Sequence, residues 1–353
     1  MRNQLTSKNI AFINDAFTRD IILHMAQTKK KISAVRLRRS ITIGDKDDVE
    51  IDKKEFFNPN CHTKFLHFFQ ASSKYLHLFN LVQPFDLVEE KPRKISLDID
   101  FDISAYHRSA ITPAGLIFIA AGQSNFNASG VDVGSNTLHA YNYKTQSLVE
   151  RAHMECKTRQ QFGLCYMSKN LFAVGGLVNG EISANCERYD IRSNKWIKLA
   201  PMNRALREVS ICSFNNRYLF RVFGINSGNN IDHTIERYDA VRDTWTTMNV
   251  TVNPILKEIY GPFCTQIGPD AVFIFGGNNI NGFSPKSCKG WVLKIEEKRG
   301  SNNAELIESR NFIPGLAGTF NKNSLLTHSG DIVFLREGIF CSYSVILITI
   351  IGY

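Results

Sequence analysis

The sequence predicts an all-β fold in which copies of one small sheet are arranged around an axis. The main observation is an internal repeat, because Leu171–Met202 recurs one period later as Leu219–Val250. The segment Glu187–Asp190 returns as Glu236–Asp239, shifted by 49 residues. In both copies a short apolar run ends in glycine, and such a run fits a strand buried on both faces better than a helix. A period of about 50 residues indicates stacked units that bury their hydrophobic faces against one another.

Each copy is expected to form four antiparallel strands. Residues 160–167 and 208–214 supply the first strand, and the apolar run supplies the second. Glycine after the second strand lets the chain bend where a neighbouring sheet leaves no room for a Cβ. After a variable polar loop, the ERYD segment forms the third strand. Trp196 or Trp245 then opens the fourth.

A less faithful copy lies upstream of this pair. Its apolar run, Leu116–Ala121, ends at Gly122, and Leu138–Asn142 corresponds to the strand that contains the tyrosine. Leu148 occupies the tryptophan position, seven residues after Tyr141. This spacing predicts a further four-stranded unit.

Another copy lies downstream. Its run Ala271–Phe275 ends in two glycines, and Trp291 falls 14 residues after Gly277, as Tyr238 does after Gly224. This spacing predicts that Trp291 takes the tyrosine position. Partial copies flank the four units, at Leu76–Glu89, which matches Leu138–Glu150, and at Ser329–Leu335.

The pattern resembles the kelch repeat family of β-propellers over about residues 65–340. The residues that carry the resemblance are Gly175–Gly176, Gly276–Gly277, Tyr189, Tyr238, Trp196 and Trp245. The pattern departs from the family where Ala121–Gly122 and Phe223–Gly224 keep one glycine of the pair. The first and fourth units also lack the tryptophan. The resemblance implies a kelch-type β-propeller over residues 61–353.

About six blades are expected, with five as the alternative. Five blades result if Leu76–Glu89 supplies the outer strands for Phe320–Leu335. Six result if Phe340–Ile350 supplies its own third and fourth strands. The apolar tail Ser344–Tyr353 lacks the turn and the tryptophan expected of a last strand.

Residues 1–60 are expected to form a short helical, basic N-terminal arm and a charged linker. Apolar residues recur every three or four positions in Ser7–Gln27, which predicts one apolar stripe along a helix. Residues 1–40 contain nine Lys/Arg and two Asp, and Asp45–Glu55 forms the linker. The stripe could pack on the propeller or on a partner helix. Self-association through this helix is therefore left open, as is an origin in a longer coiled coil.

Composition and motifs argue against several classes of protein. No N-terminal apolar run resembles a secretion signal, and Val345–Ile351 is too short to cross a bilayer. We therefore expect a cytoplasmic protein without a membrane partner. The eight cysteines form no regular framework and are expected to be free thiols. No nucleophile elbow, P-loop or metalloprotease motif occurs, so the prediction is no enzyme, no cofactor and no metal.

One face of the ring is the expected binding surface. In a four-stranded blade, the segment entering the first strand and the loop joining the second to the third lie on the same face. The joining loops are rich in Asn, Ser and Gly, which suit a peptide ligand, and guanidinium groups suit carboxylates. The repeated carboxylates, such as Glu187 and Glu236, are expected to form pairs across strands or between blades. The candidate partner-binding residues are Arg159, Arg204, Arg207, Asn226, Asn229, Asn278 and Asn279.

The function expected from this face is binding of a partner protein, as a non-catalytic scaffold or adaptor. The family resemblance implies cytoskeletal or ubiquitin-pathway partners. Sixty residues before the ring are too few for the BTB domain of the ubiquitin-ligase receptors, so that role is not carried over. Two alternatives stay open: a copper enzyme of the galactose oxidase type, and nucleic-acid binding through the basic arm. The first is disfavoured because the histidines are few and scattered, and the second because charge runs are usually solvated faces.

Overall fold

The all-β prediction is confirmed wherever the chain is described. The computed structural model describes residues 37–42, 65–80, 93–126, 128–131, 133–250, 259–279, 287–288, 290–296, 301–308, 313–314, 325–326, 331–337 and 343–351. All regular secondary structure within these ranges is β-strand. Among these residues there is accordingly no helix that could cross a membrane. The expected helix Ser7–Gln27 lies outside the described residues.

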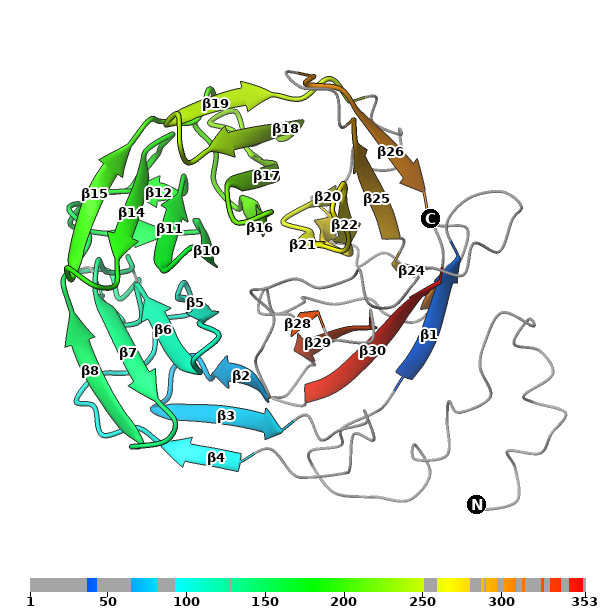
Figure 1. Cartoon of the computed structure of the whole chain (residues 1–353). Coiled ribbons are helices and arrows are strands. Elements are labelled where there is room, and N and C mark those ends of the chain that lie inside the picture. Colours follow the sequence, from blue (N-terminus) through cyan, green and yellow to red (C-terminus); the bar gives the residue numbers. More distant parts are fainter. Residues whose placement is uncertain are drawn as a thin grey trace, which may run out of the picture.

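Six sheets of the described chain follow one another around a common centre, and we call them the first to sixth blades (Figure 1). The first blade contains β2 (Phe65–Phe69), β3 (Tyr75–Asn80) and β4 (Arg93–Ser96), and the second contains β5 (Arg108–Ile111), β6 (Leu116–Ala120), β7 (Leu138–Asn142) and β8 (Ser147–Arg151). The third contains β10 (Gly163–Met167), β11 (Asn170–Val174), β14 (Cys186–Asp190) and β15 (Lys195–Leu199). The fourth contains β16 (Ser210–Phe214), β17 (Tyr218–Ile225), β18 (Ile231–Asp239) and β19 (Thr244–Thr247).

The last two blades complete the arrangement, which fits a kelch-type β-propeller. The fifth blade contains β21 (Phe263–Gln266), β22 (Ala271–Phe275), β25 (Gly290–Ile295) and β26 (Ala304–Glu308). The sixth contains β28 (Leu325–Leu326), β29 (Asp331–Glu337), β30 (Tyr343–Ile351) and β1 (Leu37–Thr42). Three smaller sheets are formed by β9 (Arg159–Gln160) with β12 (Leu177–Val178) and β13 (Glu181–Ile182), by β20 (Ile259–Tyr260) with β23 (Asn278–Asn279), and by β24 (Ser287–Cys288) with β27 (Ile313–Pro314).

The apolar runs form the second strand of each repeat unit, as predicted. In β11 the residues from Leu171 to Val174 are all buried. The glycine that follows is required by sterics: Gly176 has φ of +93°, and a Cβ there would lie 2.3 Å from the Gln160 carbonyl oxygen. Neither the backbone angle nor the space admits another residue without movement of the backbone.

The third and fourth strands of the middle blades are joined by a repeated Tyr–Trp pair. Tyr189 lies opposite Trp196, and Tyr238 lies opposite Trp245. Each indole Nε1 donates a hydrogen bond to a carbonyl oxygen of the preceding blade, at 2.7 Å for Trp196 and 3.0 Å for Trp245. The pair therefore closes the boundary between neighbouring blades. In the second blade Tyr141 lies opposite Leu148, which confirms the predicted register there.

The prediction for Trp291 is wrong by two residues. In β25, Trp291 lies opposite Ile274, whereas the tyrosines lie opposite a residue five positions before the last glycine of the run. By that criterion Leu293, opposite Val272, takes the tyrosine position, and its partner Leu306 takes the tryptophan position. The fifth blade therefore lacks the Tyr–Trp pair.

The sixth blade combines a strand from near the N-terminus with strands from near the C-terminus. The five-blade alternative is wrong, because β3 pairs with β2 and β4, whereas β29 pairs with β28 and β30. The last sheet is a separate sixth blade, and β30 supplies its third strand as expected, but the prediction that Phe340–Ile350 also supplies the fourth strand is wrong. The neighbour of β30 on the outside is β1, which pairs with β30 in parallel. Residues 37–42, expected in the arm and linker, thus form a strand of the sixth blade, because backbone pairing needs no distinctive side chains.

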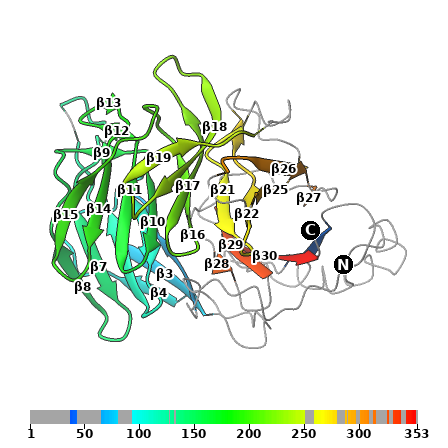
Figure 2. The same ribbon diagram turned by 45° about the horizontal axis from the view of Figure 1, so that its top comes forward.

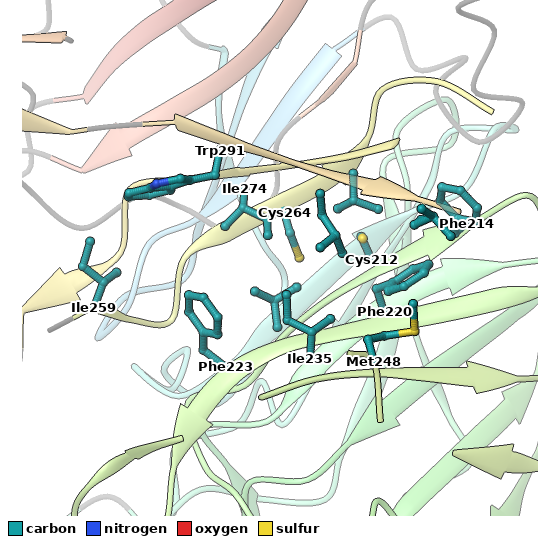
Figure 3. Packing of buried hydrophobic residues seen from close by; sticks show 14 residues of the cluster. Cys212, Phe214, Phe220, Phe223, Ile235, Met248, Ile259, Cys264, Ile274 and Trp291 are labelled. Atoms are coloured by element: carbon teal, nitrogen blue, oxygen red, sulfur yellow. The ribbon is translucent and has the colours of Figure 1, made fainter. Parts of the chain in front are cut away.

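Apolar side chains fill the boundaries between blades. At the boundary of the fourth and fifth blades, Phe220, Ile235, Cys212, Cys264 and Ile274 belong to one buried cluster, and the first three come from the fourth blade (Figure 3). Cys264 and Cys212 come from neighbouring first strands, and both are free thiols, as are Cys156, Cys165 and Cys186. The cysteines therefore pack as small hydrophobic residues, as expected.

The repeated glutamates form buried ion pairs. Glu187 accepts a hydrogen bond of 2.8 Å from Nη1 of Arg159, which lies just before the first strand of the same blade. In the next blade Leu206 takes the position of Arg159, and the cation is Arg221, which lies directly opposite Glu236 with Nη2 and Oε2 3.0 Å apart. The cross-strand pairing predicted for Glu236 is confirmed. Equivalent glutamates in the two blades are therefore paired with arginines from different elements.

One buried histidine should make stability depend on pH. His67 in β2 is buried, and its Nε2 lies 3.1 Å from the Ser109 hydroxyl of the second blade. Burial, with the nearby His107, lowers the pKa of His67 from 6.5 to about 3. As the pH falls below 6.5, His67 is protonated in the unfolded chain but stays neutral in the folded chain. The free energy of unfolding should thus fall by up to ~1.4 kcal/mol per pH unit between pH 6.5 and the lowered pKa.

Urea denaturation at several pH values between 7 and about 4 would measure this slope. The variant His67→Gln removes the titrating group and should show a shallower slope than the wild type. Equal slopes in the two proteins would contradict the assignment to His67.

Candidate functional site

The segments that enter the first strands and the loops that follow the second strands lie on one face of the ring, as predicted, because they pair with each other. β9 pairs with β12, and β12 pairs with β13. In the fourth blade Arg207 and Ile225 exchange two backbone hydrogen bonds. In the fifth, β20 pairs with β23. β9, β12 and β13 lie together at one edge of the ring in Figure 2, on the side where the β17–β18 hairpin projects. We call this side the loop face.

Arg204 is the most accessible of the predicted arginines. It lies in the segment before β16, with 59% of its side chain exposed. Nη1 donates a hydrogen bond of 2.8 Å to Asp232, which is buried near the turn that joins β17 to β18. The carboxylate fixes one side of the guanidinium, and the exposed remainder is available to a ligand.

Asp232 is held in its ionised form by its neighbours. Burial raises its pKa, but hydrogen bonds from Thr234 and the charges of Arg221 and Arg204 outweigh burial, so that the pKa lies below the ordinary value. An ionised carboxylate at this position orients Arg204 by a charge-assisted hydrogen bond.

Arg207 joins three parts of the loop face. Nη1 donates to Oε1 of Gln161 at 3.1 Å, and Nη2 donates to Oδ1 of Asn229 at 2.5 Å. Gln161 precedes β10 of the third blade, and Asn229 lies at the tip of the β17–β18 hairpin. The structure therefore brings Arg207 and Asn229 together, a contact that no sequence pattern indicates.

The hairpin tip is shaped by Asn226. Its side-chain Oδ1 accepts a hydrogen bond of 3.0 Å from the Asn230 amide, and its own amide donates to the Asn230 carbonyl oxygen. Asn229 is exposed with φ of +57°, a backbone angle that asparagine tolerates better than most residues. Asn226 thus has a structural part in the turn, and Asn229 presents its side chain on the face.

The remaining predicted residues differ in accessibility. Asn278 in β23 lies opposite Tyr260 on the loop face and is partly exposed, and Asn279 is the next residue of the same strand. Arg159 is fully buried, and its guanidinium bonds the Gly175 carbonyl, the Asn185 carbonyl and Glu187. Because none of its side chain reaches the surface, we leave Arg159 out of the binding surface.

The structure adds residues near the centre of the ring that the sequence analysis missed. Arg108 at the start of β5 donates to the Phe162 carbonyl at 2.9 Å and lies 3.5 Å from Glu208 of the fourth blade. Burial, then Glu208, raises the pKa of Tyr260, and the charge of Arg207 lowers it. Arg108, Arg207, Glu208 and Tyr260 therefore share one electrostatic environment where the loop face meets the central axis. Their only sequence signal is their position just before or at the first strand.

The chemistry of the loop face is set by the groups that line it. Its polar groups are guanidinium groups, amides and carboxylates that already pair with one another. Within the residues that the structure describes, no three His, Cys, Asp or Glu side chains are placed to hold a metal ion. Hydrogen bonding to a polypeptide is the chemistry that this arrangement supports best.

Comparisons with known proteins agree with the repeat. The family model described as Kelch motif matches residues 158–203, which span the third blade. The chain is 26% identical to Kelch-like protein 41a of Danio rerio over 148 residues, which cover 40% of this chain and 24% of that protein. It is 27% identical to Kelch repeat and BTB domain-containing protein 2 of cowpox virus over 157 residues, or 38% of this chain and 27% of the viral protein.

A mouse protein, Kelch-like protein 35, is 23% identical over 163 residues, which cover 44% of this chain and 26% of its own length. The matched region thus spans about a quarter of the length of each of these relatives.

Proposed function

Because the motif match and the kelch-like relatives support a kelch-repeat family for this chain, we propose that it is a protein-interaction module. Its loop face binds a partner protein, and it acts as a non-catalytic scaffold or adaptor in the cytoplasm. The partner belongs to the cytoskeleton or to the ubiquitin pathway. In this proposal residues 61–353, together with β1, form the binding propeller, and the rest of residues 1–60 form an arm.

The observation that carries the proposal is the exposed guanidinium of Arg204, oriented by Asp232 beside a projecting hairpin. A planar cation whose direction is fixed before binding loses little side-chain entropy when it meets a carboxylate. Arg207 and Asn229 also lie on the loop face, and a hydrogen bond already joins their side chains. A rigid, polar surface of this kind suits a peptide segment that carries acidic or amide groups.

Affinity purification with quantitative mass spectrometry tests the proposal. The double variant Arg204→Ala/Arg207→Ala should recover at least one wild-type partner at a yield lower by roughly tenfold or more, because two charge-assisted bonds are lost. The matched control is Arg192→Ala/Lys195→Ala, which removes two exposed cations from the opposite face. The control should recover the partner as the wild type does.

Thermal unfolding of all three proteins verifies that the ring is intact. Unchanged recovery by the Arg204→Ala/Arg207→Ala variant, or equal losses in the two double variants, would contradict a specific role for the loop face.

A further inference from the structure

Two exposed apolar side chains lie on the loop face, in the loop that joins β6 to β7 of the second blade. They are Phe126, which is 63% exposed, and Val131, which is 54% exposed, and we call them the apolar tip. The other exposed large apolar side chains of the described residues lie elsewhere. Val149 and Ile197 are on outer strands, and Val241 is in a turn on the opposite face. The apolar tip is therefore the part of the loop face that gains most from being covered.

The loop that contains the apolar tip is fixed at both ends. The Ser124 amide donates a hydrogen bond of 3.0 Å to the carbonyl oxygen of Asp102, in the segment that enters β5. At the other end the Arg159 amide of β9 donates to the Ser135 carbonyl oxygen, also at 3.0 Å. Because these backbone bonds already order the loop, little conformational entropy is lost when the tip is covered.

An acidic segment borders the apolar tip. Asp98, Asp100 and Asp102 alternate along the chain between β4 and β5, and all three are exposed. Ile103 and Gln123 form an antiparallel bridge, so the acidic segment and the tip both lie within a few residues of the same contact. Within the part of the chain that the structure describes, none of the three aspartates forms an ion pair. A segment that covers the tip is therefore favoured if it carries positive charge.

The N-terminal arm of this chain has both of the properties that the surface requires. Residues 1–36 contain seven Lys/Arg and only two acidic residues, Asp15 and Asp20. The apolar stripe predicted along Ser7–Gln27 ends just before the consecutive lysines 29–31. The arm thus combines apolar residues with a cationic run, as the apolar tip lies beside an acidic segment.

The arm is also long enough to reach the second blade. β1 begins at Leu37 in the sixth blade, which is next to the first blade in the ring (Figure 1). Twelve residues separate Met25, near the end of the stripe, from Leu37. An extended chain of that length spans about 40 Å. A helix over Ser7–Gln27 would add about 30 Å.

We propose that the N-terminal arm docks on the loop face of its own chain, with its apolar stripe on Phe126 and Val131 and its lysines 29–31 beside the acidic segment. Burial of the apolar tip supplies the attraction, and the charges orient the arm. The contact lies at the second blade, whereas Arg204 and Arg207 belong to the fourth. The partner-binding proposal and this one can therefore fail independently of each other.

Hydrogen–deuterium exchange of the full chain, measured by mass spectrometry, tests the contact. Deuterium uptake in residues 123–134 reports whether the apolar tip is covered. The arm variant Lys29→Glu/Lys30→Glu/Lys31→Glu should speed this uptake about tenfold, because three exposed ion pairs are replaced by repulsion.

The matched control is Lys144→Glu/Lys169→Glu/Lys195→Glu. It makes the same change of charge at three exposed lysines of the opposite face. Uptake in residues 123–134 should stay as in the wild type.

A charge exchange separates direct contact from an indirect effect. Asp98→Lys/Asp100→Lys/Asp102→Lys alone should speed the uptake, and its combination with the arm variant should restore the wild-type rate. Phe126→Ser should speed uptake in residues 7–31, because a helix of this length is marginal without packing. Val241→Ser, at the exposed apolar residue of the opposite face, should leave that uptake unchanged.

Equal uptake in the wild type and the arm variant, equal effects of the arm and control variants, or no restoration by the charge exchange would overturn the proposal. Uptake that rises when the protein is diluted would also overturn it, because the arm would then belong to a second copy.

Discussion

Replacing Glu236 by leucine is expected to lower the free energy of unfolding by about 3 to 5 kcal/mol. Arg221 and Glu236 are both completely buried, and they lie opposite each other on β17 and β18. Leucine is close to glutamate in size, so most of the cost comes from a guanidinium left in the interior without its main counter-charge. Asp232, at 3.8 Å from Nη1, compensates only in part.

The double variant Arg221→Met/Glu236→Leu separates charge from packing. It removes both charges together, and paired replacement of buried ions by apolar residues is often nearly neutral. The same register position in the fifth blade holds the apolar pair Ile274 and Trp291, so the fold accepts such residues there. We therefore expect the double variant to be more stable than Glu236→Leu.

Urea denaturation of the single and double variants measures this difference. The exposed pair Glu155 and Lys198 is the control, and Glu155→Ala should cost less than about 1 kcal/mol. A Glu236→Leu variant as stable as the wild type, or a double variant less stable than Glu236→Leu, would contradict this expectation.

Trp196→Ala is the second large effect, with an expected loss of about 3 to 5 kcal/mol. Trp196 is buried, its ring centroid lies 5.3 Å from that of Tyr189, and its Nε1 bonds the Ala152 carbonyl of the second blade. Alanine leaves a cavity between two blades and removes a hydrogen bond that crosses their boundary.

Two further substitutions divide this loss. Trp196→Phe keeps most of the packing but removes the hydrogen bond, and should cost less than Trp196→Ala. Leu148→Ala truncates the equivalent, smaller side chain of the second blade and should also cost less. Chemical denaturation provides the three values. A loss below about 1 kcal/mol for Trp196→Ala would show that the Tyr–Trp pair does not hold neighbouring blades together.

The repeat unit could be predicted because its side chains have a physical reason to recur. An apolar second strand and a glycine against a neighbouring backbone recur from blade to blade, and in the third and fourth blades a Tyr–Trp pair closes the boundary with the preceding blade. The spacing assigns Trp291 to the wrong repeat position because a loop of variable length separates it from the glycine pair. Strand pairing fixes the position instead, and the pairing of β22 with β25 cannot be read from a spacing.

The 49-residue spacing of the repeat also does not predict that Arg159 is buried. The repeat is 47 residues long between the first strands, from Gly163 to Ser210, and 49 between the third strands, from Tyr189 to Tyr238. With the shorter shift, Arg159 corresponds to Leu206, a buried apolar residue. Alignment by the first strand would therefore have indicated burial. The contact of Arg207 with Asn229 and the closure of the sixth blade by β1 depend on distant pairings that no local pattern specifies.

Hydrogen–deuterium exchange of the complex with a captured partner can show whether that partner occupies the loop face. The account predicts slower exchange on binding in residues 204–208 and 225–231, with no change in the opposite turns at 191–194 and 240–243. Protection confined to those opposite turns, with residues 204–208 exchanging as in the free protein, would contradict it.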